Sequence, residues 1–221
     1  MKLVTAILFA LSVMAAPQDS VIIDKEPYHH LKFENKYVRL FDVSVPSGAA
    51  TLFHTHPEDY LFVSIGDANL KAQVLGGQPF DLILKNGETR YSKGPLTHRV
   101  QNPEKSVFRN VTIEVLGSPG GKSDATPLDK VPHHTLVLDN DKVRVSRLVL
   151  EPGQSTGMHT HSLSEVAVVV SGGTIENQES GQQPQRMELA TGESRWHGEK
   201  RTHSIKNIGR SRVEVVAIEL K

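Results

Sequence analysis

An internal repeat without gaps is the feature that most constrains how this chain can fold. When the sequence is shifted by 105 residues (159 − 54, the spacing between His54 and His159), identical residues coincide throughout both copies. An ungapped series that includes several histidines indicates a duplicated unit. The coinciding pairs include Pro27 with Pro132, His29 with His134, Val38-Arg39 with Val143-Arg144, Gly48 with Gly153, Gly87-Glu88 with Gly192-Glu193, Asn102 with Asn207, and Ile113-Glu114 with Ile218-Glu219.

Each copy contains short segments with the composition of β-strands. The segments are rich in β-branched and aromatic residues, and Ser-Gly, Gly-Gly, Asn-Gly and Asn-Pro pairs separate them. No amphipathic helix of useful length is evident. We therefore predict an all-β protein in which each copy is a sandwich or a small barrel. The expected strands are 37–45, 60–65, 68–75, 80–85 and 107–116 in the first copy, and 142–150, 165–170 and 212–220 in the second.

The repeat also sets the expected domain boundaries. We expect an N-terminal domain at 21–116, a linker at 117–131 that is rich in glycine, proline, serine and charge, and a C-terminal domain at 132–221. Residues 1–16 combine Lys2 with an apolar run and end on small residues, which is typical of a secretory signal peptide. The sequence therefore predicts an exported protein, periplasmic or secreted, with no membrane attachment after cleavage.

Composition narrows the chemistry. The chain has 25 basic and 25 acidic residues, so a formal charge of +0 gives no support for a nucleic-acid partner. It has no cysteine, which excludes disulfides, thiolate metal sites and a cysteine nucleophile. Any metal site must therefore use nitrogen and oxygen ligands. We expect a small-molecule ligand or substrate as the partner, and a monomer or a homodimer as the assembly.

Both copies carry a His-Thr-His triplet, at His54 to His56 and at His159 to His161. Residues two apart in a strand point to the same face, so each pair of imidazoles is expected to face the interior together. In the second copy Glu165 follows after a short turn and His203 comes from a later strand. Three imidazoles and a carboxylate leave one or two positions open on Fe, Mn, Ni, Cu or Zn. We expect one or two such divalent ions per chain.

The first copy differs at the position of the carboxylate, because Tyr60 stands where the second copy has Glu165. His54, His56 and His98 are the candidate ligands there. One interpretation is a more electropositive three-histidine site that attracts an anion. A second is that Glu58 or Asp59 turns inward to supply the carboxylate. A third is that the first copy has lost its metal and is a packing scaffold, with Tyr60, Phe53 and Phe62 filling the interior.

These residues resemble the two motifs of the cupin superfamily. Gly153 through Gly172 match the first motif throughout, and Gly192, His203 and Asn207 match the second, which departs at Gly198 and Lys200, where proline and glycine are expected. The first copy matches at Gly48, His54, His56, Gly87, His98 and Asn102. The resemblance implies a bicupin, with two tandem cupin-type jelly-roll barrels of six to eight strands each. In that family the histidines and Glu165 hold the metal.

The resemblance is strongest to quercetin-dioxygenase-like and oxalate-decarboxylase-like members, but the fold alone does not set the reaction. It implies a metal-dependent dioxygenase or decarboxylase acting on a small acidic or phenolic compound, with Glu165 as a ligand that can also accept a proton. A non-enzymatic periplasmic binder of a metal or small anion is the alternative, and a structural or sensory role is a third. Tyr60, Arg195, Trp196 and Met158 are candidate pocket residues. Asn102 and Asn207 are expected to form hydrogen bonds in turns, and His29, His30, His133, His134 and His197 to face solvent or lie at strand ends.

Overall fold

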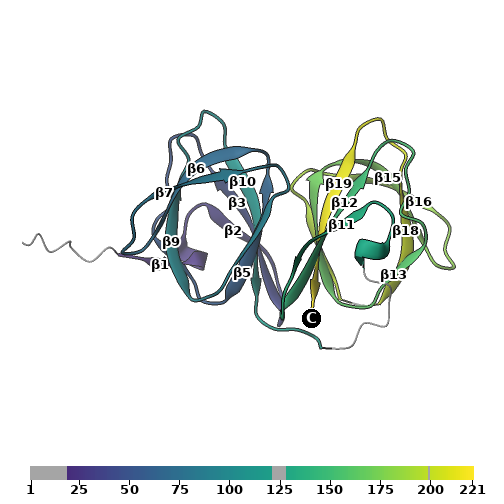
Figure 1. Cartoon of the computed structure of the whole chain (residues 1–221), viewed down its shortest axis with the longest axis horizontal. Coiled ribbons are helices and arrows are strands. Elements are labelled where there is room, and N and C mark those ends of the chain that lie inside the picture. The colour runs from purple at the N-terminus through teal and green to yellow at the C-terminus, as the bar shows by residue number, and fades with distance from the viewer. Residues whose placement is uncertain (1–18, 121–127, 199) are drawn as a thin grey trace, which may run out of the picture.

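The computed structural model describes residues 19–120, 128–198 and 200–221 (Figure 1). Over these residues the protein is all-β, as predicted, and its helical segments are two 3₁₀ turns, Ile23–Lys25 and Leu128–Lys130. Neither described helix is long and apolar enough to cross a membrane. The expected signal peptide at 1–16 and the middle of the expected linker, at 121–127, lie outside the described residues.

The first half of the chain forms two five-stranded sheets. Its strands are β1 (Val21–Ile22), β2 (His29–Glu34), β3 (Val38–Val45), β4 (His54–His56), β5 (Asp59–Ile65), β6 (Ala68–Val74), β7 (Phe80–Leu84), β8 (Thr89–Ser92), β9 (Leu96–Gln101) and β10 (Phe108–Val115). One sheet has the order β1-β4-β9-β6-β7 and the other β2-β3-β10-β5-β8. β1 pairs with β4 in parallel, and the other ladders are antiparallel.

The second half repeats this arrangement. Its strands are β11 (His134–Asp139), β12 (Val143–Leu150), β13 (His159–His161), β14 (Glu165–Ser171), β15 (Gly173–Glu179), β16 (Gln185–Leu189), β17 (Ser194–His197), β18 (Arg201–Asn207) and β19 (Val213–Leu220). They form a five-stranded sheet of order β11-β12-β19-β14-β17 and a four-stranded sheet of order β13-β18-β15-β16. Each order corresponds to the first half at the same repeat positions.

The predicted strands agree with the structure to within one residue at each end. The His-Thr-His triplets are also strands in their own right, β4 and β13. The predicted closed barrels of six to eight strands differ from what is observed. The described strands form two separate sheets in each half, with ten strands in the first half and nine in the second. Strands β1, β2, β8, β11, β15 and β16 were not among the predicted ones. The edge strands β2 and β11 were missed because His29 to Glu34 and His134 to Asp139 mix exposed polar residues with the apolar ones.

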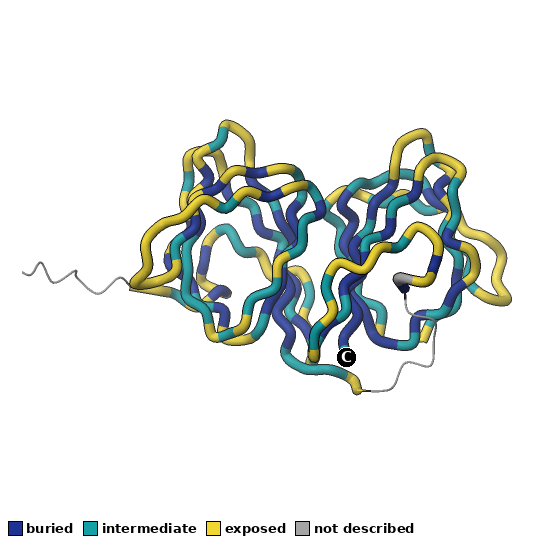
Figure 2. Tube along the Cα trace, viewed as in Figure 1, coloured by how far each residue is buried: buried dark blue, intermediate teal, exposed yellow. Residues whose placement is uncertain are grey.

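The two halves pack face to face through the sheet β2-β3-β10-β5-β8 of the first and the sheet β11-β12-β19-β14-β17 of the second. One cluster of buried residues contains side chains from β3, β5 and β10 of the first half together with β12, β14 and β19 of the second. Figure 2 shows this buried band running through the middle of the molecule. Its members are Val38, Leu40, Leu61, Val63, Val111, Ile113, Val115, Val143, Val145, Val166, Val168, Val170, Val216, Ile218 and Leu220.

Strand alternation explains why these segments are apolar almost throughout. In β3, Leu40 belongs to the cluster between the halves, whereas Phe41 points the other way into the core of the first half. In β14, Val166 faces the other half and Ala167 lines the interior of its own half. A sheet that is covered on both faces needs apolar side chains on both. The alternate positions of these strands point into the interior of their own half, and Glu165 on β14 is one of them.

The second repeat begins inside the segment expected to be a linker. Leu128 and Val131 are buried with Ala217 in a small cluster of their own. Leu128 stands at the repeat position of Ile23, which is buried in the core of the first half. Both residues open a 3₁₀ turn. The turn therefore belongs to the repeated unit, although the sequence placed it in the linker at 117–131.

Candidate metal centres

The short strands β4 and β13 place the histidine pairs. Each has buried histidines on either side of a partly exposed threonine, as expected for residues that alternate between two faces. The central threonines form hydroxyl–hydroxyl hydrogen bonds of 2.8 Å across to the next strand. Antiparallel pairing then sets His54 opposite His98 and His159 opposite His203. The third histidine of each set therefore lies beside the pair, as the repeat predicts.

In the second half the three imidazoles converge on one point. The Nε2 atoms of His159 and His161 are 3.0 Å apart, and those of His161 and His203 are 3.1 Å apart. The far nitrogens are held by acceptors, since His159 Nδ1 lies 3.1 Å from the carbonyl of Gly157 and His203 Nδ1 lies 2.8 Å from Asn177 Oδ1. A carbonyl oxygen can only accept, so both Nδ1 atoms donate. Both Nε2 atoms must then carry lone pairs that face the cluster.

These lone pairs fit a cation. His161 can donate one Nε2 proton at most, so it cannot satisfy both neighbours at once. Burial, with nearby positive and imidazole groups, lowers the pKa of His159 to about 4 and that of His203 to about 2, so both rings are neutral at physiological pH. Neutral imidazole suits Zn, Cu, Fe and Ni. The donor set of the second half therefore fits a divalent transition metal.

Glu165 lies on the outer side of this cluster. Its Oε2 is 2.7 Å from His161 Nδ1, and its Oε1 accepts a hydrogen bond of 2.5 Å from Arg201. Arg201 also lies 3.1 Å from His197 Nδ1. Burial alone would raise the pKa of Glu165, but His161, Arg201 and His197 outweigh it and lower the pKa to about 2. In this arrangement Glu165 is ionised and lies against His161 Nδ1, while the nitrogens that converge on the cluster come from the histidines.

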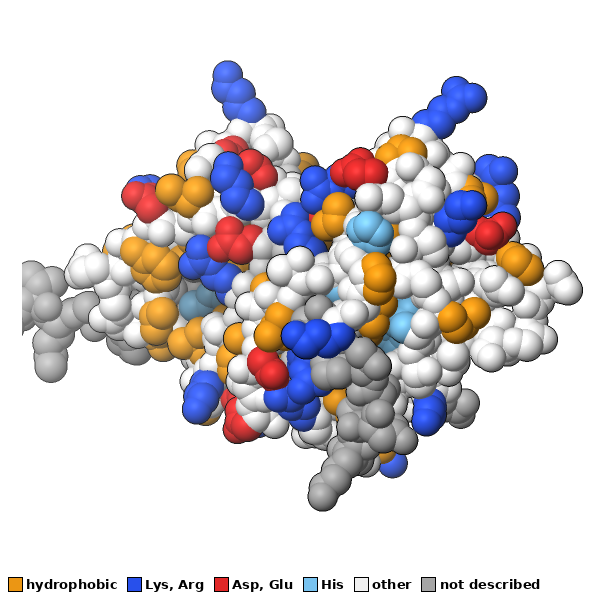
Figure 3. All heavy atoms as spheres, turned by 45° about the vertical axis from the view of Figure 1, so that its right-hand side comes forward, with side chains coloured by type: hydrophobic (Ala, Val, Ile, Leu, Met, Phe, Trp, Pro, Cys, Tyr) orange, Lys and Arg blue, Asp and Glu red, His pale blue; other side chains and the backbone are white. Residues whose placement is uncertain are grey.

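A cavity of about 260 Å³ opens beside the three histidines. Its polar side chains include Glu165, Arg195, His197 and Arg201, and the Arg195 side chain is 36% exposed. Figure 3 shows histidine and apolar side chains together on the face of the second half. The apolar walls are Leu148, Ala167, Val169, Ile175, Met187, Leu189, Ile205, Val215 and Ala217. A small molecule with an anionic group and an apolar body would match these walls.

Two of the predicted pocket residues lie elsewhere. Trp196 is next to Arg195 in β17, so it points to the opposite face, where it stacks on Phe33 and Tyr37 of the first half at 6.4 and 6.1 Å between ring centroids. Met158 is 52% exposed and lies outside the cavity wall. Arg195 lines the cavity as predicted. The error for Trp196 came from treating neighbours in a strand as if they shared a face.

Two further histidines line the same cavity; as expected they lie at strand ends, since His134 begins β11 and His197 ends β17. His197 contacts Arg201, and the ring of His134 lies 5.6 Å from that of His159 between centroids. The signal for His134 was present in the sequence, because it coincides with His29 in the repeat. His197 has no counterpart in the first half, where the same position is Ser92.

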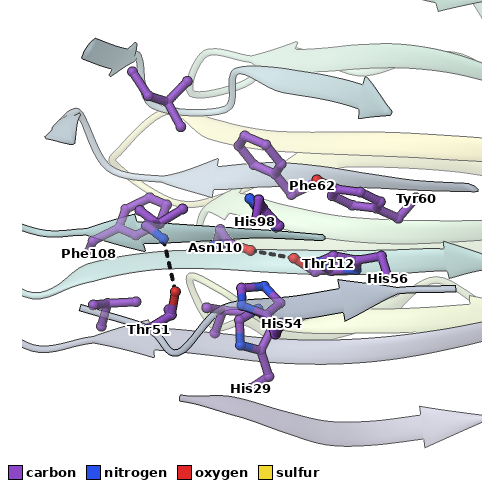
Figure 4. A pocket seen from close by; sticks show the side chains of 14 residues that line it. His29, Thr51, His54, His56, Tyr60, Phe62, His98, Phe108, Asn110 and Thr112 are labelled. Carbon is purple, nitrogen blue, oxygen red and sulfur yellow. Dashed lines mark hydrogen bonds between the residues drawn. The ribbon is translucent and has the colours of Figure 1, made fainter. Parts of the chain in front are cut away.

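In the first half the residues that meet are His29, His54 and His56. One ring nitrogen of each lies within 4.8 Å of the other two, and all three side chains are buried. His54 Nδ1 lies 3.0 Å from the carbonyl of Leu52, so its Nε2 carries a lone pair. The Nε2 atoms of His54 and His98 have no hydrogen-bond partner among the described residues. His98 remains adjacent, with its ring centroid 4.5 Å from that of His54 (Figure 4).

His29 was expected to face solvent or lie at a strand end; it begins β2, but its side chain is buried. Its side chain is 6% exposed, and its Nδ1 is 2.5 Å from Oε2 of the buried Glu26. Hydrogen bonding and attraction to His29 outweigh the effect of burial and lower the pKa of Glu26. The ring centroids of His29 and His54 are 4.5 Å apart. Coincidence with His134 in the repeat was again the signal that could have identified this residue.

Tyr60 supplies no carboxylate and no anionic oxygen. Its ring stacks on that of His56 with centroids 3.8 Å apart and an angle of 12° between planes. Burial raises the pKa of its phenol, so Tyr60 is neutral. Neither Glu58 nor Asp59 turns inward. Asp59 instead accepts hydrogen bonds from Tyr91 and from the backbone N–H of Gly94, and pairs with Lys142 of the other half at 2.9 Å.

Large side chains make the first cavity small. It measures about 40 Å³, against about 260 Å³ in the second half. Tyr60, Phe62 and Phe108 line it, whereas the second half has Glu165, Ala167 and Val213 at these positions. Since one water needs roughly 10–15 Å³ of such volume, the first cavity has room for a few waters and no larger molecule. The filling predicted for Tyr60 and Phe62 is confirmed, but Phe53 lies outside this cavity and packs against Arg99.

Asn102 and Asn207 are hydrogen-bonding residues of turns, as predicted. Both are fully buried. Asn207 Nδ2 donates to the carbonyls of Leu150 and Ser211 at 2.8 Å, and its Oδ1 accepts from the backbone of Gly209 at 2.9 Å. Asn102 forms the same set of contacts in the first half. Each side chain fixes the loop that leaves the strand carrying the third histidine.

Comparison with known proteins supports the fold. No protein-family model matches the sequence, and no curated protein matches it. Among solved structures, AerE from Microcystis aeruginosa is 14% identical, with 89% of this chain and 98% of that one covered and a TM-score of 0.63. Oxalate decarboxylase from Bacillus subtilis, which has Mn(II) centres, is 12% identical, with 90% and 76% covered and a TM-score of 0.60.

A further solved structure bears on the family. A cupin 2 conserved barrel domain protein from Leptotrichia buccalis is 9% identical, with 87% of this chain and 88% of that one covered and a TM-score of 0.55. At these identities the likeness concerns the fold and leaves the reaction open. The chain therefore has the cupin fold that its two motifs predict, and it resembles oxalate decarboxylase in fold.

Proposed function

We propose that this cupin-fold chain is a metal-dependent enzyme, a dioxygenase or a decarboxylase, that acts on a small acidic compound in the cavity of its second half. We further propose that it is a bicupin and that it is exported. The observation that carries the enzymatic proposal is the convergence of three Nε2 atoms, 3.0 and 3.1 Å apart, on the wall of a cavity of about 260 Å³. No comparable space exists beside the histidines of the first half among the described residues.

His159, His161 and His203 would hold the metal, and Glu165 would complete the set if it turned from Arg201. A divalent transition metal bound there supplies a Lewis acid for an oxygen-bearing substrate. Three protein nitrogens leave coordination positions open, which favours chemistry over a purely structural role. The residues around the cluster then determine which compound is bound and where its proton goes.

The guanidinium groups favour an anionic substrate. Arg195 Nε is held by Glu193 at 2.6 Å, and a guanidinium has further N–H groups that remain available to the cavity that Arg195 lines. Arg201 is partly engaged by Glu165 and His197. A substrate carboxylate could pair with either arginine in the planar, two-point manner that a guanidinium allows. The apolar walls restrict the rest of the substrate to a small body.

Glu165 is placed to accept a proton. It is ionised in the present arrangement because its neighbours hold its pKa at about 2. Arg201 is one of those neighbours, so a substrate carboxylate that took Arg201 away would raise the pKa of Glu165. Glu165 would then become a stronger base only when substrate is present. This coupling between binding and basicity is the role we assign to the Glu165–Arg201 pair.

The test combines metal content with turnover. Protein purified from the periplasm is loaded with Mn²⁺ or Fe²⁺, and oxygen uptake and carbon dioxide release are measured with oxalate-like dicarboxylates and phenolic acids. We expect turnover by the wild type. Arg195→Gln should raise KM by about 10- to 100-fold, since a charged hydrogen bond contributes roughly 1.5–3 kcal/mol. Arg186→Gln is the control, because that side chain is 72% exposed and lies outside the cavity.

The Glu165→Gln variant distinguishes an enzymatic function from non-enzymatic binding of a small anion. In an enzyme this change lowers kcat while metal and substrate are still bound. If the metal-loaded chain binds small carboxylates at the second cavity but neither wild type nor variants consume them, the protein is a binder of small anions and the enzymatic proposal fails.

A further inference from the structure

The first half carries a histidine cluster whose third member comes from outside the motif that both copies share. His29 begins β2, an edge strand, and its ring lies 4.5 Å from that of His54 between centroids. Its ring nitrogen falls within 4.8 Å of those of His54 and His56. Figure 4 shows His29 extending from its strand toward His54, with His56 and His98 around the same space. Three strands therefore contribute imidazoles to this point.

A buried carboxylate fixes the orientation of His29. Glu26 is 2% exposed, and its Oε2 lies 2.5 Å from His29 Nδ1 and accepts the backbone N–H of Tyr28 at 2.8 Å. A histidine that donates its Nδ1 proton to a carboxylate turns the lone pair of Nε2 to the other side. This carboxylate–histidine pairing is the usual support of a metal-binding imidazole. The carbonyl of Leu52 supports His54 in the same way.

The second half lacks this arrangement at the matching positions. Val131 stands where the first half has Glu26, and His134 Nδ1 lies 3.2 Å from the carbonyl of Pro132 instead. The ring of His134 is 5.6 Å from that of His159, and His134 is not among the nitrogens that converge there. The two halves thus place their carboxylates differently. The first has Glu26 behind His29, and the second has Glu165 behind His161.

We propose that the first half binds a divalent transition metal through His29, His54 and His56, with His98 adjacent, as a closed site without catalytic function. The cavity of about 40 Å³ leaves no room for a substrate. The donors are imidazoles, and the buried carboxylate of Glu26 offsets the charge of the ion from behind His29. Glu114 lies behind His56, with its Oε1 3.4 Å from His56 Nδ1, and its Oε2 accepts a hydrogen bond from Arg39 at 2.9 Å.

The role of such an ion is mechanical. It joins β2, an edge strand of one sheet, to β4 in the facing sheet, and the described strands of the two sheets do not otherwise form a common ladder. An ion that binds the folded chain only stabilises it in proportion to its concentration relative to Kd. The site therefore holds the start of the first half in place, independently of whether the second half is an enzyme.

Zinc binding to a chain with a disabled second cluster tests the stoichiometry. The full chain carrying His159→Ala and His203→Ala is titrated with Zn²⁺ against a chelator of known affinity. We expect about one Zn²⁺ per chain and a rise in melting temperature on binding. In this background Glu26→Gln should weaken binding by about 10- to 100-fold, and His29→Ala should weaken it further. His134→Ala, at the matching position of the other half, should leave it unchanged.

A thiol at position 29 tests direct ligation. The chain has no cysteine, so in the same background His29→Cys introduces the one thiol present. Thiolate is a strong ligand for such metals, and with Co²⁺ we expect the near-ultraviolet charge-transfer absorption of a cobalt–thiolate bond. His134→Cys should bind Co²⁺ without that absorption. Because the thiol can itself bind the metal, this variant also covers the case in which His29→Ala fails to fold.

Two results would overturn the proposal. One is a chain with a disabled second cluster that binds no Zn²⁺ although its circular dichroism matches that of wild type. The other is Co²⁺ binding to the His29→Cys variant without the charge-transfer absorption, which would place the ion away from position 29. Neither result bears on the second half, whose function is tested separately by turnover.

Discussion

Removing the amide of Asn177 should weaken metal binding in the second half alone. Asn177 on β15 accepts from His203 Nδ1 at 2.8 Å, and His203 is 2% exposed. Asn177→Ala takes away this acceptor and leaves a buried donor without its partner. The first half has no counterpart of this amide, because Ala72 stands at the matching position.

The expected magnitude follows from the role of the hydrogen bond. Loss of a partner that orients a metal-binding imidazole costs about 10- to 100-fold in affinity, or about 1.4–2.7 kcal/mol at 1.36 kcal/mol per tenfold change. Asn177 lines the cavity, so water can reach His203 Nδ1 and bring the loss toward the lower end of this range. Without metal, the unsatisfied donor should lower the free energy of unfolding by about 1–3 kcal/mol.

The assay uses a chain whose first cluster is disabled by His54→Ala and His56→Ala, so that only the second half reports. Zn²⁺ is titrated against a chromophoric chelator, with Gln178→Ala as the control, because that neighbouring side chain lies outside the cavity wall. If Asn177→Ala binds Zn²⁺ as tightly as its parent while His203→Ala abolishes binding, then His203 needs no acceptor and the reasoning is refuted.

Three other changes test the cavity, the interface and the charge pair between the halves. Ala167→Phe places in the second cavity the residue that Phe62 supplies in the first, so it should abolish binding of small carboxylates, measured by calorimetry, while Zn²⁺ content stays the same; retained carboxylate binding would contradict the account of the cavity volumes. Leu61→Ala should lower the free energy of unfolding in urea by about 2–5 kcal/mol, because Leu61 is fully buried between the halves, and a loss below about 1 kcal/mol would show that the interface contributes little. Burial would raise the pKa of Asp59, but Tyr91 and Lys142 outweigh it and lower the pKa to about 2, from an ordinary value of 3.8. A depressed pKa stabilises the folded state above the unfolded value, and the effect disappears as pH falls through the folded one. Asp59→Asn should therefore cost about 1 kcal/mol at neutral pH and much less at about pH 2 and below, and a cost that does not change with pH would exclude the ionic origin.

The sequence predicted the repeat, the most apolar strands and the inward-facing triplets because each depends on local periodicity or on identity between copies. It did not predict the edge strand that carries His29, since the alternation of that strand is obscured by exposed apolar residues such as Leu31, which is 46% exposed. Trp196 was misplaced because no local signal says which face of β17 meets the other half. The Glu165–Arg201 pair was also out of reach, because it depends on how β14 and β18, which belong to different sheets, face each other.

The same alternation explains how a duplicated unit can hold two different sites. Positions that face the other half are apolar in both copies, as in Leu61 and Val166, because each long sheet must cover the other. The positions between them face inward, and there the copies differ in charge and size, as in Tyr60 and Glu165.

A change at an inward position leaves the interface untouched, so its cost is confined to one half. Exchanging a carboxylate for a phenol, and alanine for phenylalanine, closes the first cavity without disturbing the second. The interface therefore keeps the halves together while their interiors diverge, one toward a small cluster of imidazoles and the other toward an open cavity with arginines at its wall.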